Sequence, residues 1–211
     1  AGYEKVLAVH LSAGLSGTYN LVRLMGEDCE ALEVRAFDSV SGSLGIGLTL
    51  IQAARMIEQG CTWEQLLQAV PQMLAGTKVF FCVDTLEYLQ KGGRIGKITA
   101  VAGSLLQIKP IITFAPTGEL INVAKGRGRK AALDKLMALF RESCPKDGDF
   151  LAAVVDGGIP EEGDALRDQL MPTLPDGTEV IRGQIDCTLG TYVGPHLLGA
   201  GFQVIPDWRV L

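Results

Sequence analysis

Apolar runs and amphipathic segments follow one another over the first 76 residues. The runs at 5–11 and 33–37 are typical of buried parallel strands. The segments at 18–29 and 44–59 space their apolar residues as helices do, and the Thr-x-x-Gln capping box at Thr62 opens a third helix. This β-α-β-α order predicts a parallel sheet whose loops gather at the carboxyl ends of its strands.

The sequence also predicts the buried face of the first of these helices and the ends of the other two. Four residues of the first helix are expected to share its buried face: Leu21, Val22, Leu24 and Met25. Gly60 is expected to end the second helix. The third helix is expected to reach about Ala75, with Pro71 kinking or shortening it because proline lacks an N–H.

The residues after 76 combine strand-like and helix-like patterns. Strands are expected over 78–83, 108–114, 120–124, 150–155, 178–185 and 202–205. Helices are expected over 85–90, 97–107, 129–143 and 160–170. A turn at 116–119 joins the second and third of these strands in a hairpin. The prediction is an α/β protein with a parallel-sheet domain at 1–76 and a mixed-sheet domain at 77–211.

Composition excludes several function classes. With 47% hydrophobic and 20% charged residues, the chain can bury a sizeable core and is not disordered as a whole. A net charge of −5 argues against a dedicated nucleic-acid binder. The five cysteines are widely spaced and lack paired histidines, so we expect no metal site, no disulfide framework and a cytoplasmic location.

The beginning of the chain is unusual. Ala1 stands where a methionine would, and the first strand-like run follows almost at once, with no basic and apolar leader. Two strands are too few for a complete doubly wound sheet. We therefore expect that an upstream segment of the first domain is missing.

Two loops of small residues follow the first two predicted strands. The first, 12–18, places hydroxyls at a helix N-terminus, which suits a carboxylate or phosphate. The second, 38–43, repeats the pattern with Asp38 and two serines, and both loops are expected to face one crevice. The same residue types cap helices and form turns, so a purely structural role stays open.

Other polar residues also leave two interpretations. Arg94 follows a Gly-Gly turn, from which it can bind an anion or the carbonyls that end a helix. Four cations within 125–130 fit a phosphate, an acidic partner or a solvated turn. His10 ends a predicted strand and is expected to be a satisfied core histidine, whereas His196 is expected to be exposed.

Six segments carry a resemblance that covers nearly the whole chain. They are LSAGLSGTYN (11–20), FDSVSGSLGIG (37–47), VDTLEYLQKGGRIGK (83–97), KPIITFAPTGEL (109–120), KGRGRKAAL (125–133) and GTYVGP (190–195). In content and order they resemble the DegV family of bacterial lipid-binding proteins.

The resemblance implies two α/β domains with one long-chain fatty acid buried between them. It implies a carrier, not an enzyme, that presents the fatty-acid carboxylate to a separate fatty-acid kinase, with no cofactor. The implied ligand-binding residues are Ser12, Ala13, Ser16, Gly17, Thr18, Ser39, Ser41, Arg94 and Tyr192. Arg127 and Arg129 would serve the kinase or the acyl phosphate. Residues that would line an apolar tunnel, or form plain core, are Ile46, Leu105, Leu106 and Ile112.

The sequence departs from the family pattern in the expected head-group region. Ala13 stands where the family commonly has a second serine, Tyr192 stands where it has a histidine, and the family's N-terminal segment is absent. These changes leave two alternatives: a degenerate member that holds another amphiphile, and a phosphotransferase that acts on a small anion. The sequence leaves open a peripheral encounter with a membrane and the oligomeric state.

Overall fold

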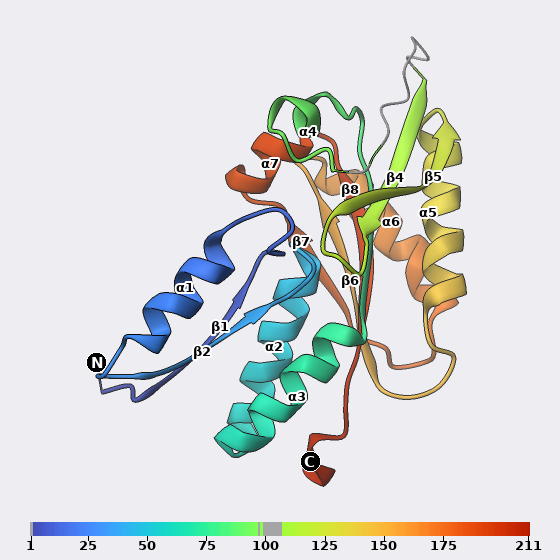
Figure 1. Cartoon of the computed structure of the whole chain (residues 1–211). Coiled ribbons are helices and arrows are strands. Elements are labelled where there is room, and N and C mark those ends of the chain that lie inside the picture. Colours follow the sequence, from blue (N-terminus) through green and yellow to red (C-terminus); the bar gives the residue numbers. More distant parts are fainter. Residues whose placement is uncertain (1, 97, 99–106) are drawn as a thin grey trace.

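The structure, a computed structural model, describes residues 2–96, 98 and 107–211. Two sheets with surrounding helices make up the fold (Figure 1). The smaller sheet pairs β1 (Lys5–His10) in parallel with β2 (Glu33–Asp38). The larger sheet has six strands in the order β5-β4-β3-β8-β6-β7. The predicted α/β class, with a parallel first sheet and a mixed second sheet, is confirmed.

The six strands of the larger sheet are antiparallel to their neighbours except for β6 and β7, which run parallel. Their bounds are β3 (Thr77–Cys82), β4 (Ile108–Phe114), β5 (Leu120–Arg127), β6 (Phe150–Asp156), β7 (Val180–Gln184) and β8 (Leu198–Val204). The last strand is longer than predicted because its first half contains glycine and alanine, which carry little strand signal.

Helices cover both faces of the larger sheet (Figure 1). On one face lie α5 (Arg129–Ser143) and α6 (Pro160–Leu170), and on the other lies α2 (Leu44–Glu58). In β6, Ala152 and Val154 face α5 and α6. Ala153 and Val155 face α2. Burial on both faces explains why this strand is a continuous apolar run.

Helix α2 connects the two sheets. Leu44 and Leu48 pack against the larger sheet, whereas Met56 packs with Val9 of β1 and with α3 (Trp63–Ala75). Because α2 contributes to both cores, it belongs to both halves of the molecule. The domain boundary near Gly76 stays a prediction.

Helix α3 begins and ends as predicted. Both hydrogen bonds of the capping box between Thr62 and Gln65 are present. The helix reaches Ala75, as predicted, and Pro71 does not shorten it. Pro71 itself is exposed, so its ring displaces no core residue.

Helix α1 (Thr18–Glu27) corrects another prediction. Of the four apolar residues assigned to its buried face, Leu21, Leu24 and Met25 are exposed. The helix approaches β2 through Gly26, where an added Cβ would lie 2.9 Å from Val34. Packing against a sheet of only two strands therefore leaves the apolar stripe open to solvent.

Short elements complete the described chain. They are α4 (Glu87–Lys91), α7 (Cys187–Val193), and single 3₁₀ turns at Met171–Thr173 and Trp208–Val210. The sequence did not predict α7, which contacts α4 at the upper end of Figure 1. The helix expected over 97–107 falls largely outside the described residues. Among the helices described, none is long and apolar enough to cross a bilayer.

Candidate functional site: an apolar cavity between the two sheets

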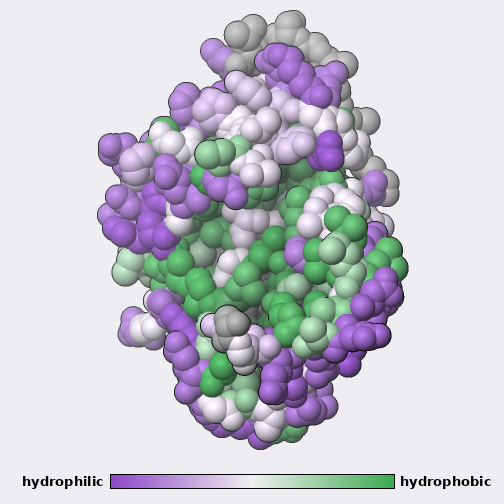
Figure 2. All heavy atoms as spheres, turned by 90° about the vertical axis from the view of Figure 1, so that its left-hand side faces the viewer, coloured by the Kyte–Doolittle hydropathy of each residue, from purple (hydrophilic) through white to green (hydrophobic). Residues whose placement is uncertain are grey.

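A cavity of about 460 Å³ lies where the loops after β1 and β2, helix α2 and the larger sheet meet. Seen from the α1 side, hydrophobic residues gather around a hollow in the middle of this face (Figure 2). Most of the wall is apolar: Val9, Leu11, Leu15, Ile46, Phe81, Leu89, Ile112, Phe114, Leu120, Ile185, Leu189, Val193 and Leu197. We call this space the first cavity.

Two of the residues that the sequence suggested for a tunnel, Ile46 and Ile112, belong to this wall. The other two, Leu105 and Leu106, lie outside the described residues. The space beside β3 depends on Gly199, because a Cβ there would lie 2.5 Å from the ring of Phe81. Glycine in β8 therefore lets Phe81 stand in the cavity wall.

Polar residues form a smaller part of the wall. They are His10, Ser16, Thr18, Ser43, Arg94, Thr188 and Tyr192. The Ser16 and Thr18 hydroxyls lie 2.8 Å apart and hydrogen-bond to each other. Gly17 is the N-cap of α1, and a Cβ on it would meet no atom within 4 Å, so close packing does not require glycine there. His10 departs from its prediction, because its buried Nε2 has no hydrogen-bond partner among the residues described.

The two small-residue loops are joined by hydrogen bonds that backbone N–H groups of the first loop donate to the second. The Ser12 N–H donates to the Ser41 carbonyl at 2.9 Å, and the Ala13 N–H donates to the Asp38 carboxylate at 3.1 Å. Asp38 also accepts from the N–H of Val40 at 2.9 Å. Asp38 therefore caps its own turn and holds the first loop beside it.

Two of the predicted hydroxyls, those of Ser12 and Ser39, are hydrogen-bonded to backbone carbonyls. Ser12 is fully buried and donates to the Gly118 carbonyl at 2.8 Å. Ser39 donates to the Ser41 carbonyl at 2.9 Å and accepts from the Ser41 N–H. Ser39 and Ser41 line a separate cavity of about 730 Å³, which we call the second cavity. The predicted serines are therefore close in space but do not share one cavity.

Arg94 joins the two halves of the molecule at the first cavity. Its guanidinium donates to the Gly92 carbonyl at 2.8 Å and to the Leu15 carbonyl at 3.3 Å, and it lies 5.0 Å from the centre of the Tyr192 ring. Arg94 binds a carbonyl at the end of α4, as one of its two interpretations expects. It also lines the cavity, where the other interpretation would place an anion. None of the ion pairs between described residues includes Arg94.

Arg129 belongs to another polar cluster. It donates to Glu162 at 2.6 Å, to Asp84 at 3.2 Å and to the His196 carbonyl at 2.8 Å. Lys109 pairs with Asp84 at 3.0 Å. Burial by itself would raise the pKa of Asp84, but the hydrogen bonds from Lys109 and His196 and the charge of Arg129 outweigh it and lower the pKa.

Arg127 and Arg129, which were predicted to act together, therefore have different surroundings. Arg129 is largely occupied by neighbouring carboxylates, whereas Arg127 is exposed at the end of β5. His196, predicted to be exposed, is so. Among the described residues, no group of three or more His, Cys, Asp or Glu is placed to hold a metal ion.

Sequence reasoning missed much of the cavity wall. Thr188, Leu189 and Val193 come from α7, a helix that the sequence did not predict, and Ile185 lies just before it, at the end of a predicted strand. Phe114 and Ile112 lie two apart on β4, and this period-two spacing was the available signal for their shared face. An apolar cavity with hydroxyls and an arginine in its wall fits an amphiphile with an anionic head group.

Comparisons of sequence and of structure with known proteins agree on one family. A family described as "Uncharacterised protein, DegV family" matches residues 1–204. A DegV domain-containing protein of Clostridium acetobutylicum is 38% identical over 199 residues, which are 94% of this chain and 70% of that protein.

Two solved structures are similar over most of the chain. One is described as fatty acid binding of a DegV family protein from Thermus thermophilus, with a TM-score of 0.87, 28% identity, and coverage of 96% of this chain and 71% of that one. The other is a DegV family protein from Eubacterium eligens loaded with heptadecanoic acid, with a TM-score of 0.79, 25% identity, and coverage of 95% and 73%.

Proposed function

Because the chain belongs to the DegV family, we propose that it binds a long-chain fatty acid in the first cavity. The observation that carries this proposal is an apolar cavity of about 460 Å³ with the guanidinium of Arg94 in its wall. Burial of an acyl chain against that wall is favourable by roughly 0.8 kcal/mol per methylene. The carboxylate would stay charged beside a cation.

The head-group contacts are assigned to four residues: Ser16, Thr18, Arg94 and Tyr192. All four line the first cavity, and hydroxyl and guanidinium groups are donors suited to a carboxylate. Ser12, Ala13, Gly17, Ser39 and Ser41 would act indirectly, by fixing the two loops around the cavity. Tyr192 would offer its hydroxyl as a neutral donor.

The same proposal makes the chain a carrier rather than an enzyme. A separate cytoplasmic fatty-acid kinase would phosphorylate the bound carboxylate to an acyl phosphate. Exposed cations near the N-terminus of α5, namely Lys125, Arg127 and Lys130, give a surface suited to an acidic partner. Arg129 would support this surface by anchoring α5 to α6 through Glu162.

The direct test is to identify what the purified chain carries. Native mass spectrometry followed by extraction is expected to find one long-chain fatty acid per chain. A chain that is empty and that binds no added palmitic acid would contradict the proposal. Stabilisation by a nucleotide instead of a fatty acid would favour the phosphotransferase alternative.

Arg94→Ala is expected to weaken the binding of palmitic acid by about tenfold or more, because a hydrogen bond to a charged group is lost. The measurement is a binding titration with the purified variant. Arg23→Ala is the matched control, since Arg23 lies on α1 and pairs with the exposed Glu27. Equal affinities for Arg94→Ala and the control would remove Arg94 from the head-group role.

A further inference from the structure

One aromatic side chain separates the first cavity from the second. The second cavity, of about 730 Å³, is bounded by β2, the end of α3, the start of β3 and the turn after β4. Of the residues that the structure describes, Phe114 alone lines both cavities. Its ring therefore forms part of the wall between them.

The loop after β2 supplies the other side of this wall. Ser39, Val40 and Ser41 line the second cavity, whereas Gly42 and Ser43 line the first. A Cβ on Gly42 would lie 3.1 Å from Cζ of Phe114 and 2.8 Å from a methyl carbon of Leu11. The tip of the Phe114 ring thus closes against the backbone at Gly42, and glycine allows this close approach.

The ring of Phe114 is held from its own sheet. It meets the Phe81 ring edge to face, with 6.4 Å between ring centres and 80° between planes. Its backbone pairs with Leu120 across the hairpin, and the Ala115 N–H donates to the Glu119 carbonyl at 2.8 Å. These contacts keep the side chain at the wall.

The far side of the wall is also suited to hydrocarbon. Phe37, Leu74, Val79 and Pro116 contribute to the second cavity, while its charged residues are Asp38 and Lys78. A hydrocarbon chain that passed the wall would therefore meet apolar side chains along part of a lining that also includes serines and threonines. Each additional buried methylene is worth roughly fourfold in affinity.

We propose that Phe114, closed against Gly42, limits the length of the acyl chain that the first cavity accepts. This inference rests on the proposed function and adds a specificity-determining residue to it. A chain that fits the first cavity ends before the wall. A longer acyl chain has to fold back or leave methylenes in water. If the wall is opened, the end of the acyl chain can enter the second cavity instead.

The test compares two saturated fatty acids, palmitic acid and the longer behenic acid, in binding titrations with the full chain. Phe114→Ala is expected to raise the affinity for behenic acid relative to palmitic acid by about tenfold or more. Phe114→Leu, which keeps apolar contact with Phe81 and perturbs folding less, is measured beside it and is expected to change the ratio in the same direction. Thermal unfolding shows that each variant is folded.

Phe37→Leu is the matched control, because Phe37 lines the second cavity and not the first. It enlarges the far side while leaving the wall intact, so the ratio of affinities is expected to stay as in the unchanged chain. An unchanged ratio in folded Phe114→Leu overturns the inference, as does an equal rise in Phe37→Leu. Failure of the unchanged chain to bind either acid overturns the proposed function instead.

Discussion

Replacing Phe140 with alanine is expected to lower the free energy of unfolding by about 4 kcal/mol, because the loss of a buried ring leaves a large space in the core. Phe140 lies on α5, is fully buried and packs in the core between α5, α6 and the larger sheet. Its ring meets Phe202 of β8 edge to face at 5.5 Å, and Phe202 meets Phe150 of β6 in the same way at 6.4 Å.

The expected loss of stability is large because one substitution weakens the contacts of α5 with two strands, β8 and β6. Alanine removes the ring that joins α5 to β8, and the helix cannot move in to close the space because Ala132 and Leu136 hold it against the same core. Urea unfolding measures the change. Leu139→Ala, at the neighbouring and only partly buried position, is expected to cost clearly less. Similar losses for both variants would contradict this account of the core.

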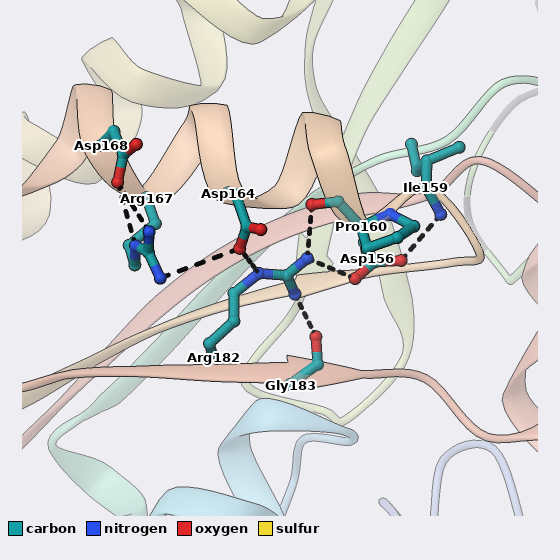
Figure 3. Close-up of polar contacts among 8 residues, drawn as sticks. All are labelled: Asp156, Ile159, Pro160, Asp164, Arg167, Asp168, Arg182 and Gly183. Carbon is teal, nitrogen blue, oxygen red and sulfur yellow. Dashed lines mark hydrogen bonds and ion pairs between the residues drawn. The ribbon is translucent and has the colours of Figure 1, made fainter.

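Asp156→Asn is expected to cost about 3 kcal/mol, because it removes the buried carboxylate of the two that pair with a partly buried arginine. Asp156 ends β6 and is 1% exposed. Its carboxylate accepts from the Arg182 guanidinium at 2.5 Å and from the Ile159 N–H at 2.8 Å (Figure 3). Arg182 also binds Asp164 and the Pro160 and Gly183 carbonyls, so one side chain connects β6, β7 and the start of α6.

The stability lost in Asp156→Asn is expected to depend on pH. Burial by itself would raise the pKa of Asp156, but the hydrogen bonds from Arg182 and from backbone N–H groups outweigh it and hold the pKa below its usual value of 3.8. A carboxyl group with a lowered folded-state pKa stabilises the fold above its unfolded pKa and loses that effect as the pH falls through the folded pKa. The difference between the two proteins should therefore be full at neutral pH and shrink below about pH 4.

Asp168→Asn provides the matched control for this experiment. Asp168 pairs with Arg167 at 2.9 Å on the same helix, but its side chain is 65% exposed (Figure 3). Exposed pairs contribute little, so the expected change is within about 0.5 kcal/mol. Unfolding curves at neutral and acidic pH compare the two variants. A loss in Asp156→Asn that stays constant down to low pH would contradict the assigned role of the carboxylate.

Local patterns were enough to predict most elements. Apolar residues at helical spacing predicted α5, and three of them, Leu136, Met137 and Phe140, are buried. The helix expected over 160–170 is α6, which has Pro160 in its first turn, and Thr62 with Gln65 predicted the start of α3. These signals succeed because capping, turn chemistry and periodicity act within a few residues.

Packing decided the features that local patterns predicted wrongly or missed. The stripe of α1 has helical spacing, but Leu21 and Leu24 are exposed, and the helix approaches the two-stranded sheet closely at Gly26. The buried polar groups depend on partners far along the chain, as Ser12 does on Gly118 and Asp156 on Arg182. No local signal reports such pairings, because their free energy depends on burial that only the folded sheet provides.

The candidate site shows the same division. The sequence by itself determined the loops, their hydroxyls and the arginine after the Gly-Gly turn, since these are local and carry the family's motifs. Only the tertiary structure decided which of them line the first cavity, and it placed Ser16, Thr18, Arg94 and Tyr192 there while burying Ser12 elsewhere. The reason is geometric: a cavity is the space left between elements, so its wall and its limit at Phe114 depend on how β4, α2 and the loops pack.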